Sequence, residues 1–385
     1  MDLFGSETDY DPDDEDTDFA ESVDEAAAPA EPTTPKTTEQ IIGHVVIEQQ
    51  LLDSFNAGRF PHALIFSGPQ GIGKATMAYR VARFLLRHGQ TSAPEDSLFG
   101  APEPITHTSL NVNRNDPVFM RVASGGHTDL LSIERPYDDT KGRFKDTLPV
   151  EEVRKITPFL RLTAADGGWR VVIVDDADTM NRNAQNALLK ILEEPPPHTV
   201  LILVAHRAGA LLPTIRSRSR LIHFSTLSPD HMRDLLAANG HRPSAQELEI
   251  IMALSEGSIG KALHLLSADG IPLLGQILDL LDQPAPDWIA IHKFSDYCAT
   301  TDHGFDLVCE LMPGIFNRLA RAKARKNKPA GFGVHTNWAI RTADATSLEA
   351  LLGHAQTLEE GLTRVQFANL DKRQGILSAF AQVFN

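Results

Sequence analysis

Residues 68–76 read GPQGIGKAT, a glycine-rich stretch that joins two segments of different pattern. An apolar run, HALIFSG (62–68), precedes it and predicts a buried strand. TMAYRVARFLLRHG (76–89) follows, with the apolar spacing of an amphipathic helix that ends at Gly89. A strand, a glycine-rich turn and a helix in this order form a phosphate-binding loop, whose backbone N–H groups surround an anion at the helix N-terminus. The sequence therefore predicts an α/β domain of the nucleotide-binding type.

The loop departs from the pattern of a magnesium-nucleotide site, G-x-x-x-x-G-K-[ST], at one position. Gly68, Gly73 and Lys74 match that pattern. Ala75 takes the place of the hydroxyl residue that contacts magnesium. Thr76 lies one position later, about 100° further round a helix. We therefore expect no working metal site at this loop.

A second feature is VVIVDDAD (171–178), an apolar strand that ends in carboxylates. Asp175 is placed to hold magnesium at the strand end. Asp176 stands where ATPases of this type usually carry Glu and is one methylene shorter, and an error of about 1 Å in position costs roughly 100-fold in rate. The alternative is that both carboxylates only cap a strand–loop junction. The residues predicted to surround a nucleotide are Gly68, Gly71, Gly73, Lys74, Ala75, Thr76, Asp175 and Asp176.

Strands and helices alternate along the chain up to about residue 225. NRNAQNALLKILEE (181–194) predicts a helix, and TVLILVAH (199–206) predicts a fully apolar strand. Such alternation is typical of a parallel sheet covered on both faces. After Phe224 the pattern is helical, with Ser228 as the expected N-cap of the next helix. The predicted organisation is a disordered acidic tail (1–40), an α/β domain (41–225), a small helical domain (226–283) and a second helical domain (284–385).

The charge of the chain is concentrated in its first forty residues. The formal net charge is −15, and residues 1–40 hold fourteen acidic side chains and one basic one, Lys36. Such an acidic segment with few apolar residues cannot bury enough surface to offset its chain entropy. The two cysteines, Cys298 and Cys309, cannot build a disulfide framework, and no apolar run reaches the length of a membrane span. These features predict a cytoplasmic protein with reduced thiols and no secretory signal.

Three arginines at alternate positions follow the last predicted strand, in LLPTIRSRSR (211–220). A run of like charges is usually a solvated face, and the sharper alternative is an arginine presented to a neighbouring subunit's phosphate. This segment follows IIGHVVIEQQLLDSFNAGRFPHALIFSGPQGIGKAT (41–76) and VVIVDDADTMNRNAQNALLKILEEPPPHTVLILVAH (171–206). In that order the three resemble the AAA+ ATPases of clamp loaders, and more closely the delta-prime branch of bacterial DNA polymerase III clamp loaders. The resemblance is strong over about 41–225 and weaker beyond.

The resemblance implies an AAA+ domain, a helical lid (226–283) and a C-terminal helical collar (284–385) that joins a pentameric ring. It aligns Ser217-Arg218-Ser219 with a Ser-Arg-Cys motif, which makes Arg218 a catalytic arginine that acts in trans on the ATP of an adjacent subunit. The implied partners are other clamp-loader subunits of the motor and delta types. Through the complex they include the sliding clamp and primed DNA, with no membrane. The chain would thus be part of a DNA-directed DNA polymerase holoenzyme.

Against this family the chain shows three departures, Ala75, Asp176 and Gly260, the last at the place of a nucleotide-sensing arginine. Each removes a different part of the hydrolysis machinery, and delta-prime is the branch in which that loss is expected. His206 lies near the position of a polar sensor at a strand end. We expect little or no ATPase activity, no required cofactor and at most weak ATP binding. The alternative is an ATP-hydrolysing motor subunit or related remodeller, in which Thr76 replaces Ala75 in function.

Two further features concern metal and nucleic acid. Many relatives insert a four-cysteine zinc module after the helix of the phosphate loop, but residues 88–130 contain no cysteine, so we expect no zinc. The basic run RLARAKARKNK (318–328) could face solvent, another subunit or DNA. A third hypothesis, a stand-alone DNA-binding adaptor, rests on this run alone. The neighbouring subunits and the role of the acidic tail stay open at this stage.

Overall fold

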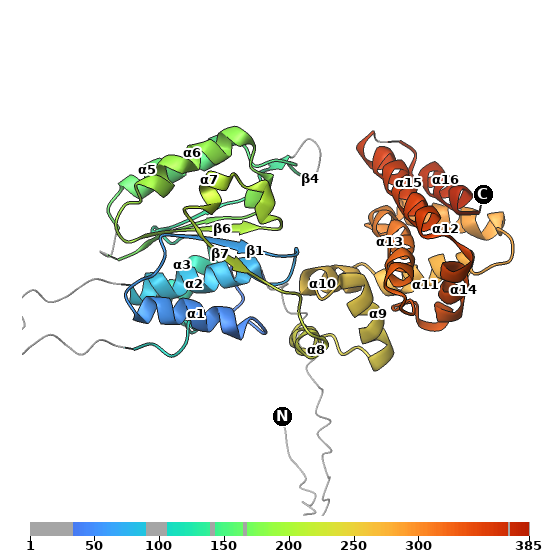
Figure 1. Ribbon diagram of the computed structural model, residues 1–385, viewed down its shortest axis with the longest axis horizontal. Coiled ribbons are helices and arrows are strands. Elements are labelled where there is room, and N and C mark those ends of the chain that lie inside the picture. Colours follow the sequence, from blue (N-terminus) through green and yellow to red (C-terminus); the bar gives the residue numbers. More distant parts are fainter. Residues whose placement is uncertain (1–33, 90–105, 139–142, 165–167, 369, 385) are drawn as a thin grey trace, which may run out of the picture. The chain divides into compact units, whose positions relative to one another are not determined.

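Parallel strands form the central sheet of the first half of the chain (Figure 1). Their order across the sheet is β2-β5-β6-β1-β7, and every pairing between neighbours is parallel. The strands are β1 (Ala63–Ser67), β2 (Leu130–Ile133), β5 (Arg170–Val174), β6 (Thr199–Ala205) and β7 (Arg220–His223). The computed structural model describes residues 34–89, 106–138, 143–164, 168–368 and 370–384, so most of the predicted acidic tail lies outside the described residues.

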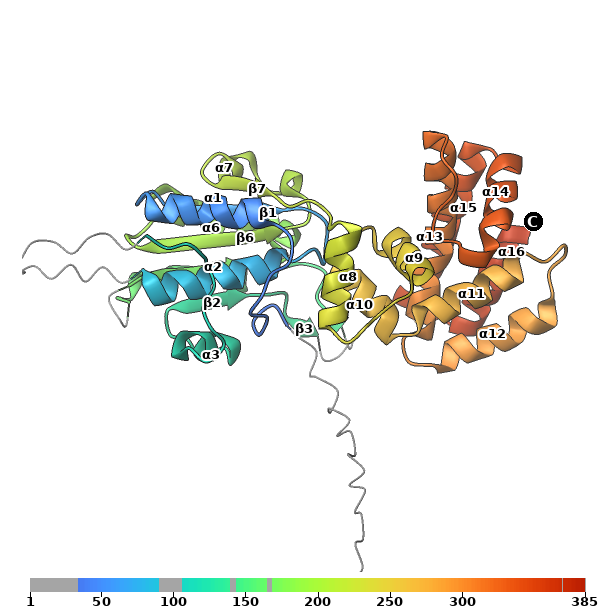
Figure 2. The same ribbon diagram turned by 90° about the horizontal axis from the view of Figure 1, so that it is seen from below.

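Helices cover both faces of this sheet (Figure 1), and Figure 2 looks onto the face that carries α1 and α2. One face carries α1 (Val45–Asn56), α2 (Lys74–His88) and α3 (Pro117–Ala123). The other carries α4 (Val150–Arg154), α5 (Ile156–Arg161), α6 (Arg182–Glu193) and α7 (Pro213–Arg216). Successive residues of β1 enter opposite cores, with Phe66 beside α2 and Ile65 beside α6, because side chains alternate along a strand. Residues that face either side of the strand must therefore be apolar, and all five residues of β1 are buried. The predicted α/β class with a parallel sheet is confirmed.

Short elements connect these layers. An antiparallel hairpin of β3 (Tyr137–Asp138) and β4 (Arg143–Phe144) follows β2. Single 3-10 turns, η1 (Ala177–Thr179) and η2 (Ala208–Ala210), follow β5 and β6. These turns lead the chain away from the carboxyl ends of the two strands, which is where polar side chains gather.

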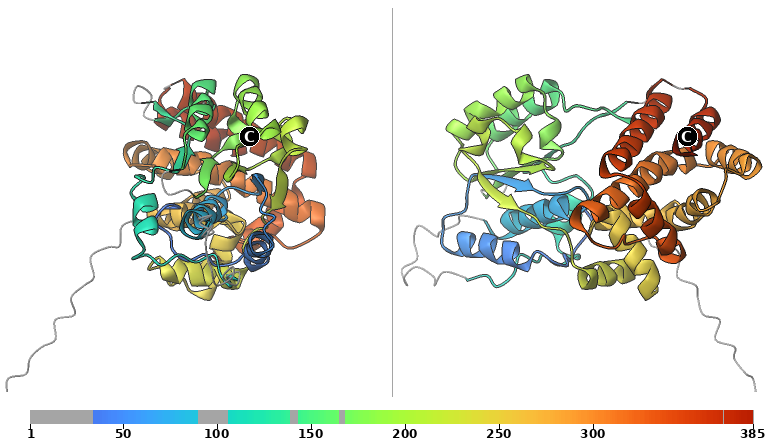
Figure 3. Two further views of the ribbon diagram at one scale, coloured as in Figure 1. Left: turned by 90° about the vertical axis from the view of Figure 1, so that its left-hand side faces the viewer. Right: turned by 45° about the vertical axis from the view of Figure 1, so that its right-hand side comes forward.

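Beyond residue 225 the described chain is helical, as predicted. One core is shared by α8 (Pro229–Ala238), α9 (Ala245–Ser255) and α10 (Ile259–Ser267). A larger core is shared by α11 (Gly270–Leu281), α12 (Trp288–Thr300), α13 (Gly304–Arg325), α14 (Thr336–Ala345), α15 (Leu348–Phe367) and α16 (Lys372–Phe384), the orange-to-red helices of Figure 3. A third 3-10 turn, η3 (Gly333–His335), precedes α14. In the described residues no helix is long and apolar enough to cross a membrane.

Serine side chains begin the helices of the smaller core. The Ser228 hydroxyl accepts a hydrogen bond from the backbone N–H of His231, which confirms the predicted N-cap. Ser244 and Glu247 form a reciprocal capping box at α9. Since α11 packs in the larger core, the helices on either side of residue 283 share one apolar interior. The predicted boundary between lid and collar at that residue stays a prediction.

Gly89 ends α2 as the sequence predicts, but it does not adopt the left-handed conformation in which glycine often ends a helix. Its backbone has φ −83°, a conformation open to any residue. A Cβ atom at this position would lie 1.9 Å from Cδ1 of Trp169 and 2.5 Å from the Leu85 carbonyl oxygen. The glycine is therefore required by the close approach of Trp169, which covers the end of the helix.

Gly89→Ala should destabilise the fold by about 1–3 kcal/mol, because the methyl group must displace an indole ring. Denaturant unfolding of the full chain measures the change. The matched control is Gly353→Ala in α15, where an added Cβ meets nothing within 4 Å and should stabilise by about 0.5–1 kcal/mol. Equal effects of the two substitutions would contradict the packing argument.

Candidate functional site

The phosphate loop joins β1 to α2 and has the turn geometry that glycine permits. Gly71 and Gly73 have φ values of +73° and +97°, in the left-handed region where a side chain is strained. At Gly68 a Cβ atom would lie 2.4 Å from the carbonyl oxygen of Phe224. The loop is thus formed as predicted, and α2 begins at Lys74 with its N-terminus toward the loop.

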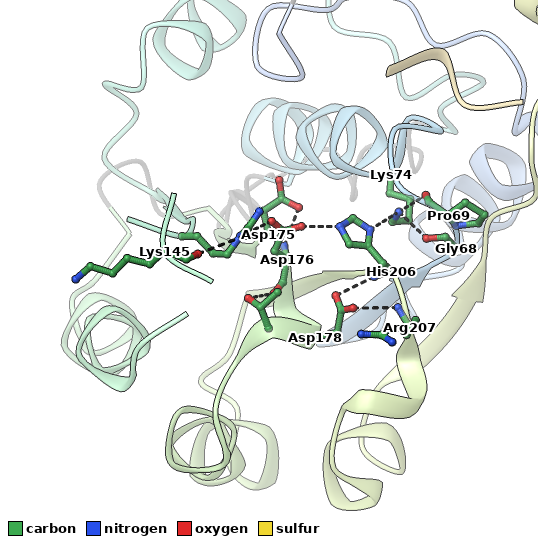
Figure 4. Close-up of polar contacts among 11 residues, drawn as sticks. Gly68, Pro69, Lys74, Lys145, Asp175, Asp176, Asp178, His206 and Arg207 are labelled. Carbon is green, nitrogen blue, oxygen red and sulfur yellow. Dashed lines mark hydrogen bonds and ion pairs between the residues drawn. The ribbon is translucent and has the colours of Figure 1, made fainter. Parts of the chain in front are cut away.

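The Lys74 ammonium group is occupied by groups of its own chain (Figure 4). Nζ donates to the carbonyl oxygens of Gly68, at 2.7 Å, and Pro69, and lies 3.2 Å from Nδ1 of His206. An ammonium has three N–H donors, so these three acceptors account for all of them. Lys74 is 3% exposed, and burial lowers its pKa to about 8 against the opposing attraction of nearby carboxylates such as Asp175.

The two carboxylates that follow β5 lie in different surroundings. Asp176 accepts from Nε of Arg135 at 2.7 Å, and its other oxygen lies 2.7 Å from Nε2 of His206. These contacts hold the pKa of Asp176 below its usual value, with the His206 hydrogen bond as the largest cause. Among the described residues, Asp175 accepts a single hydrogen bond, from the backbone N–H of Asp176. Burial, then the charge of Asp176, raises its pKa to about 6.

The first turn of α10 lies directly on the phosphate loop. The Gly260 N–H donates to the Gly71 carbonyl oxygen at 2.9 Å. A Cβ atom at Gly260 would lie 3.0 Å from Cα of Gly71, and one at Gly71 would lie 2.4 Å from the Ser258 hydroxyl oxygen. The backbones at Gly71 and Gly260 are therefore in contact, with little room between them for a side chain at position 260. Lys261, the next residue, is exposed.

A cavity of about 380 Å³ lies between the loop and these helices. Its polar end is bordered by the loop from Gln70 to Thr76, by Asp175 and Asp176, and by His206. Its apolar end is lined by Ile41, Ile42, Leu227, Leu235, Ile259 and Leu263. Backbone N–H groups of a glycine-rich loop, next to apolar side chains that line the same cavity, fit the phosphates and base of a nucleotide. A magnesium ion fits this site less well, because Ala75 has no side-chain oxygen and the carboxylate of Asp176 is already held by Arg135 and His206.

The structure thus brings together the residues predicted to surround a nucleotide. It adds Arg135, which the sequence did not assign, and His206, which the sequence placed only near the position of a polar sensor. Arg135 reaches Asp176 from the segment after β2, and its Nη1 donates to the carbonyl oxygen of Lys145 beside β4. His206 links Lys74 to Asp176. In the described ranges no group of three or more His, Cys, Asp or Glu side chains is placed to hold a metal. Residues 90–105 of the segment expected to lack zinc are outside those ranges, so that expectation stays a prediction.

Arg218 lies on the surface, between α7 and β7. Its side chain is 37% exposed, its Nη2 lies 3.2 Å from Oε1 of Glu193, and its Nη1 donates to the Thr214 carbonyl oxygen. Such a surface ion pair contributes about 0–1 kcal/mol, so Arg218 is held only weakly. Next to it, the Ser219 hydroxyl oxygen is buried and has no partner among the described residues.

The basic run at the end of α13 divides into engaged and exposed side chains. Arg318 stacks over the ring of Phe332 at 4.9 Å, Arg321 pairs with Glu256, and Lys323 donates to the Ala343 carbonyl oxygen at 2.6 Å. Arg325, Lys326 and Lys328 are exposed. Part of the run therefore serves packing, and its contact with DNA stays a hypothesis.

Asp175→Asn should stabilise the fold at neutral pH. A carboxyl whose pKa rises from 3.8 unfolded to about 6 folded destabilises the native state once both states have ionised. The cost is absent below about pH 4, grows between pH 4 and 6, and is complete above that range, where it amounts to about 1–3 kcal/mol. Asn keeps the oxygen that accepts from the Asp176 N–H. Thermal unfolding should therefore show a gain at pH 8 that vanishes near pH 4.

The matched control is Asp234→Asn in α8, an exposed carboxylate. It should leave the melting temperature unchanged at both pH values. A gain for Asp175→Asn of the same size at pH 4 and pH 8 would show that the effect is not electrostatic.

Comparison with known proteins agrees with this geometry. A family described as "DNA polymerase III, delta subunit" matches residues 104–228. The delta′ subunit of DNA polymerase III from Escherichia coli K12 is 31% identical over 245 residues, 63% of this chain and 66% of the relative. The Pseudomonas aeruginosa delta′ subunit is 36% identical over 54% of this chain and 58% of its own length. The gamma subunit of Buchnera aphidicola is 29% identical over 60% of this chain and 58% of the relative.

A solved gamma subunit-related protein of Thermotoga maritima covers 86% of this chain and 98% of its own length, with 16% identity and a TM-score of 0.36. The chain thus spans less than two thirds of the length of these two delta′ relatives, 66% and 58%. The range matched by the family, 104–228, includes β2, β5, β6 and β7 of the sheet and the arginine segment. The chain belongs to the family of DNA polymerase III clamp-loader subunits that includes the delta′ and gamma/tau proteins.

Proposed function

We propose that the chain is a delta′-type subunit of the DNA polymerase III clamp loader, which helps load the sliding clamp on primed DNA. In this role Arg218 acts in trans on ATP bound by a neighbouring subunit, and the chain itself does not hydrolyse ATP. The observation that carries the proposal is the contrast between an exposed, weakly held Arg218 and a Lys74 whose donors are all used internally.

Sheet topology supports a role in trans. β7 runs parallel to β1, with Leu64 beside Arg220 and Ser67 beside His223. The phosphate loop follows the carboxyl end of β1, whereas Arg218 precedes the amino end of β7. The two sites are thus separated by at least the length of a four-residue strand, about 13 Å, which an arginine side chain directed outward does not span. A phosphate that meets Arg218 therefore belongs to another molecule.

The engaged carboxylate argues against hydrolysis at the chain's own loop. A general base needs a free oxygen within about 3 Å of the attacking water. Both oxygens of Asp176 are already taken, by Arg135 and by His206, and these contacts keep its pKa low. With Ala75 in the loop, the site also lacks the hydroxyl that would contact magnesium. Weak nucleotide binding without turnover is consistent with this arrangement.

The wider role follows from the family. We infer an assembly with motor-type and delta-type subunits in a pentameric ring in the cytoplasm. The AAA+ domain and helical lid would contact the neighbours and the C-terminal helices would form the collar. A motor subunit is the second candidate, favoured by 29–31% identity to gamma and gamma/tau proteins. Lys74-dependent ATPase activity of the isolated chain would favour that candidate.

Arg218→Ala should lower ATP turnover of the reconstituted clamp loader, with sliding clamp and primed DNA, by at least tenfold. An arginine that stabilises transition-state charge is worth about 10³–10⁵ in rate, and other sites in the ring dilute the effect. Steady-state ATPase and size-exclusion chromatography are measured on the same complexes. The complex should assemble as the wild type does.

The matched control is Arg216→Ala, an exposed arginine two residues earlier in α7. It should change turnover by less than twofold. If Arg218→Ala leaves turnover unchanged in an intact complex, or abolishes assembly, the donor role is wrong.

A further inference from the structure

We propose that His206 weakens the binding of nucleotide phosphates at the loop by linking Lys74 to Asp176. This inference deepens the proposed function, since it rests on the loop's lack of turnover and names the residue that maintains it. His206 is therefore a positioning residue that holds two potential phosphate and metal contacts against each other.

The two contacts of the imidazole require one arrangement of protons. Lys74 is a donor only, so Nδ1 of His206, 3.2 Å from Nζ, must be the acceptor. The ring proton then lies on Nε2 and is donated to Asp176 at 2.7 Å. A neutral Nε2–H imidazole satisfies both neighbours, and the ring acts as a bridge between an ammonium and a carboxylate.

The backbone fixes the ring in this place. β6 pairs with β1, and Ala205 lies beside Ser67, so His206 leaves the sheet next to the first residue of the loop. The Gly68 N–H donates to the Ala205 carbonyl oxygen, and the His206 N–H donates to Oδ1 of Asp178 at 2.9 Å. In Figure 4 the ring lies between Lys74 and Asp176, and Asp178 holds its backbone from below. The bridge is thus built on strand ends and does not depend on a flexible loop.

The far side of the bridge is equally fixed. Asp176 receives Nε of Arg135, and Arg135 is held in turn by the Lys145 carbonyl oxygen. Rotation of Asp176 away from His206 would leave a partly buried arginine without its carboxylate. The acid therefore stays in place, and with it the imidazole and the ammonium.

A phosphate that enters the loop must draw Lys74 away from its acceptors. Two of them, the Gly68 and Pro69 carbonyl oxygens, belong to the loop itself, whereas His206 comes from a different strand. Loss of the ammonium would leave Nδ1 unpaired in a partly buried site, which opposes binding. Asn at position 206 is polar but too short to reach both neighbours. We expect it to release Lys74 toward the loop interior and to tighten phosphate binding at least tenfold.

The experiment is calorimetric titration of the full chain with ATP and with ADP in EDTA, so that phosphate recognition is measured without magnesium. His206→Asn should bind at least tenfold more tightly than the wild type. The double variant Lys74→Met/His206→Asn should lose that gain, because Lys74 makes the new contact. The control His223→Asn changes an exposed histidine at the end of β7 and should match the wild type.

Equal affinities of His206→Asn and the wild type would overturn the proposal, as would micromolar ATP binding by the wild type. A second measurement uses the wild-type protein, so its result does not depend on whether a variant folds. Nitrogen-15 spectra of the wild-type imidazole should show a neutral ring with its proton on Nε2, and a proton on Nδ1 would contradict the bridge. Neither measurement involves Arg218, so a negative result for His206 does not affect the proposed role of Arg218 in trans. A negative result in the Arg218 ATPase assay likewise does not affect the proposed role of His206.

Discussion

The position of β1 between β6 and β7 is the constraint on which the functional geometry depends. Because all three strands are parallel, the phosphate loop and His206 follow the carboxyl ends of β1 and β6 on one side of the sheet. Arg218 precedes the amino end of β7, on the opposite side. A single register therefore places Lys74 beside His206 and keeps Arg218 away from both. The same pairing buries alternate residues of β1 in two cores, so a slip of one residue would exchange them.

Lys74 and Arg218 consequently differ in the free energy needed to release each from its contacts within the chain. Lys74 is buried, its pKa is lowered to about 8, and its hydrogen bonds would be costly to leave unmade. Arg218 is partly exposed, and its pair with Glu193 is worth about 0–1 kcal/mol. Only the second group can leave its intramolecular contact at small cost. A subunit that acts on a neighbour's nucleotide, and not on its own, needs this asymmetry.

Much of the fold could be predicted from the sequence, because its signals are local. The apolar runs around Ile65 and Val172, the glycines of the loop and the Ser228 cap all depend on residues close in the chain. Arg135 could not be assigned in this way, since its partner Asp176 is 41 residues distant. Gly89 was recognised as a helix end, but its cause, the ring of Trp169, comes from across the fold. His206 was noted as lying near the position of a polar sensor at a strand end, but its contacts with Lys74 and Asp176 come from other parts of the chain.

Ala75, Asp176 and Gly260, the three departures from the family pattern, lie close to one another around the phosphate loop in the structure. Asp176 is short enough to be held between Arg135 and His206, and Gly260 lets the backbone of α10 contact Gly71. Ala75 adds no hydroxyl to compete for these groups. Two of these positions therefore take part in contacts within the chain. A side chain at position 260 would place its Cβ 3.0 Å from Cα of Gly71, so the loop and α10 would have to move apart by a few tenths of an ångström. Such a substitution alone leaves the contacts of Lys74 and Asp176 in place.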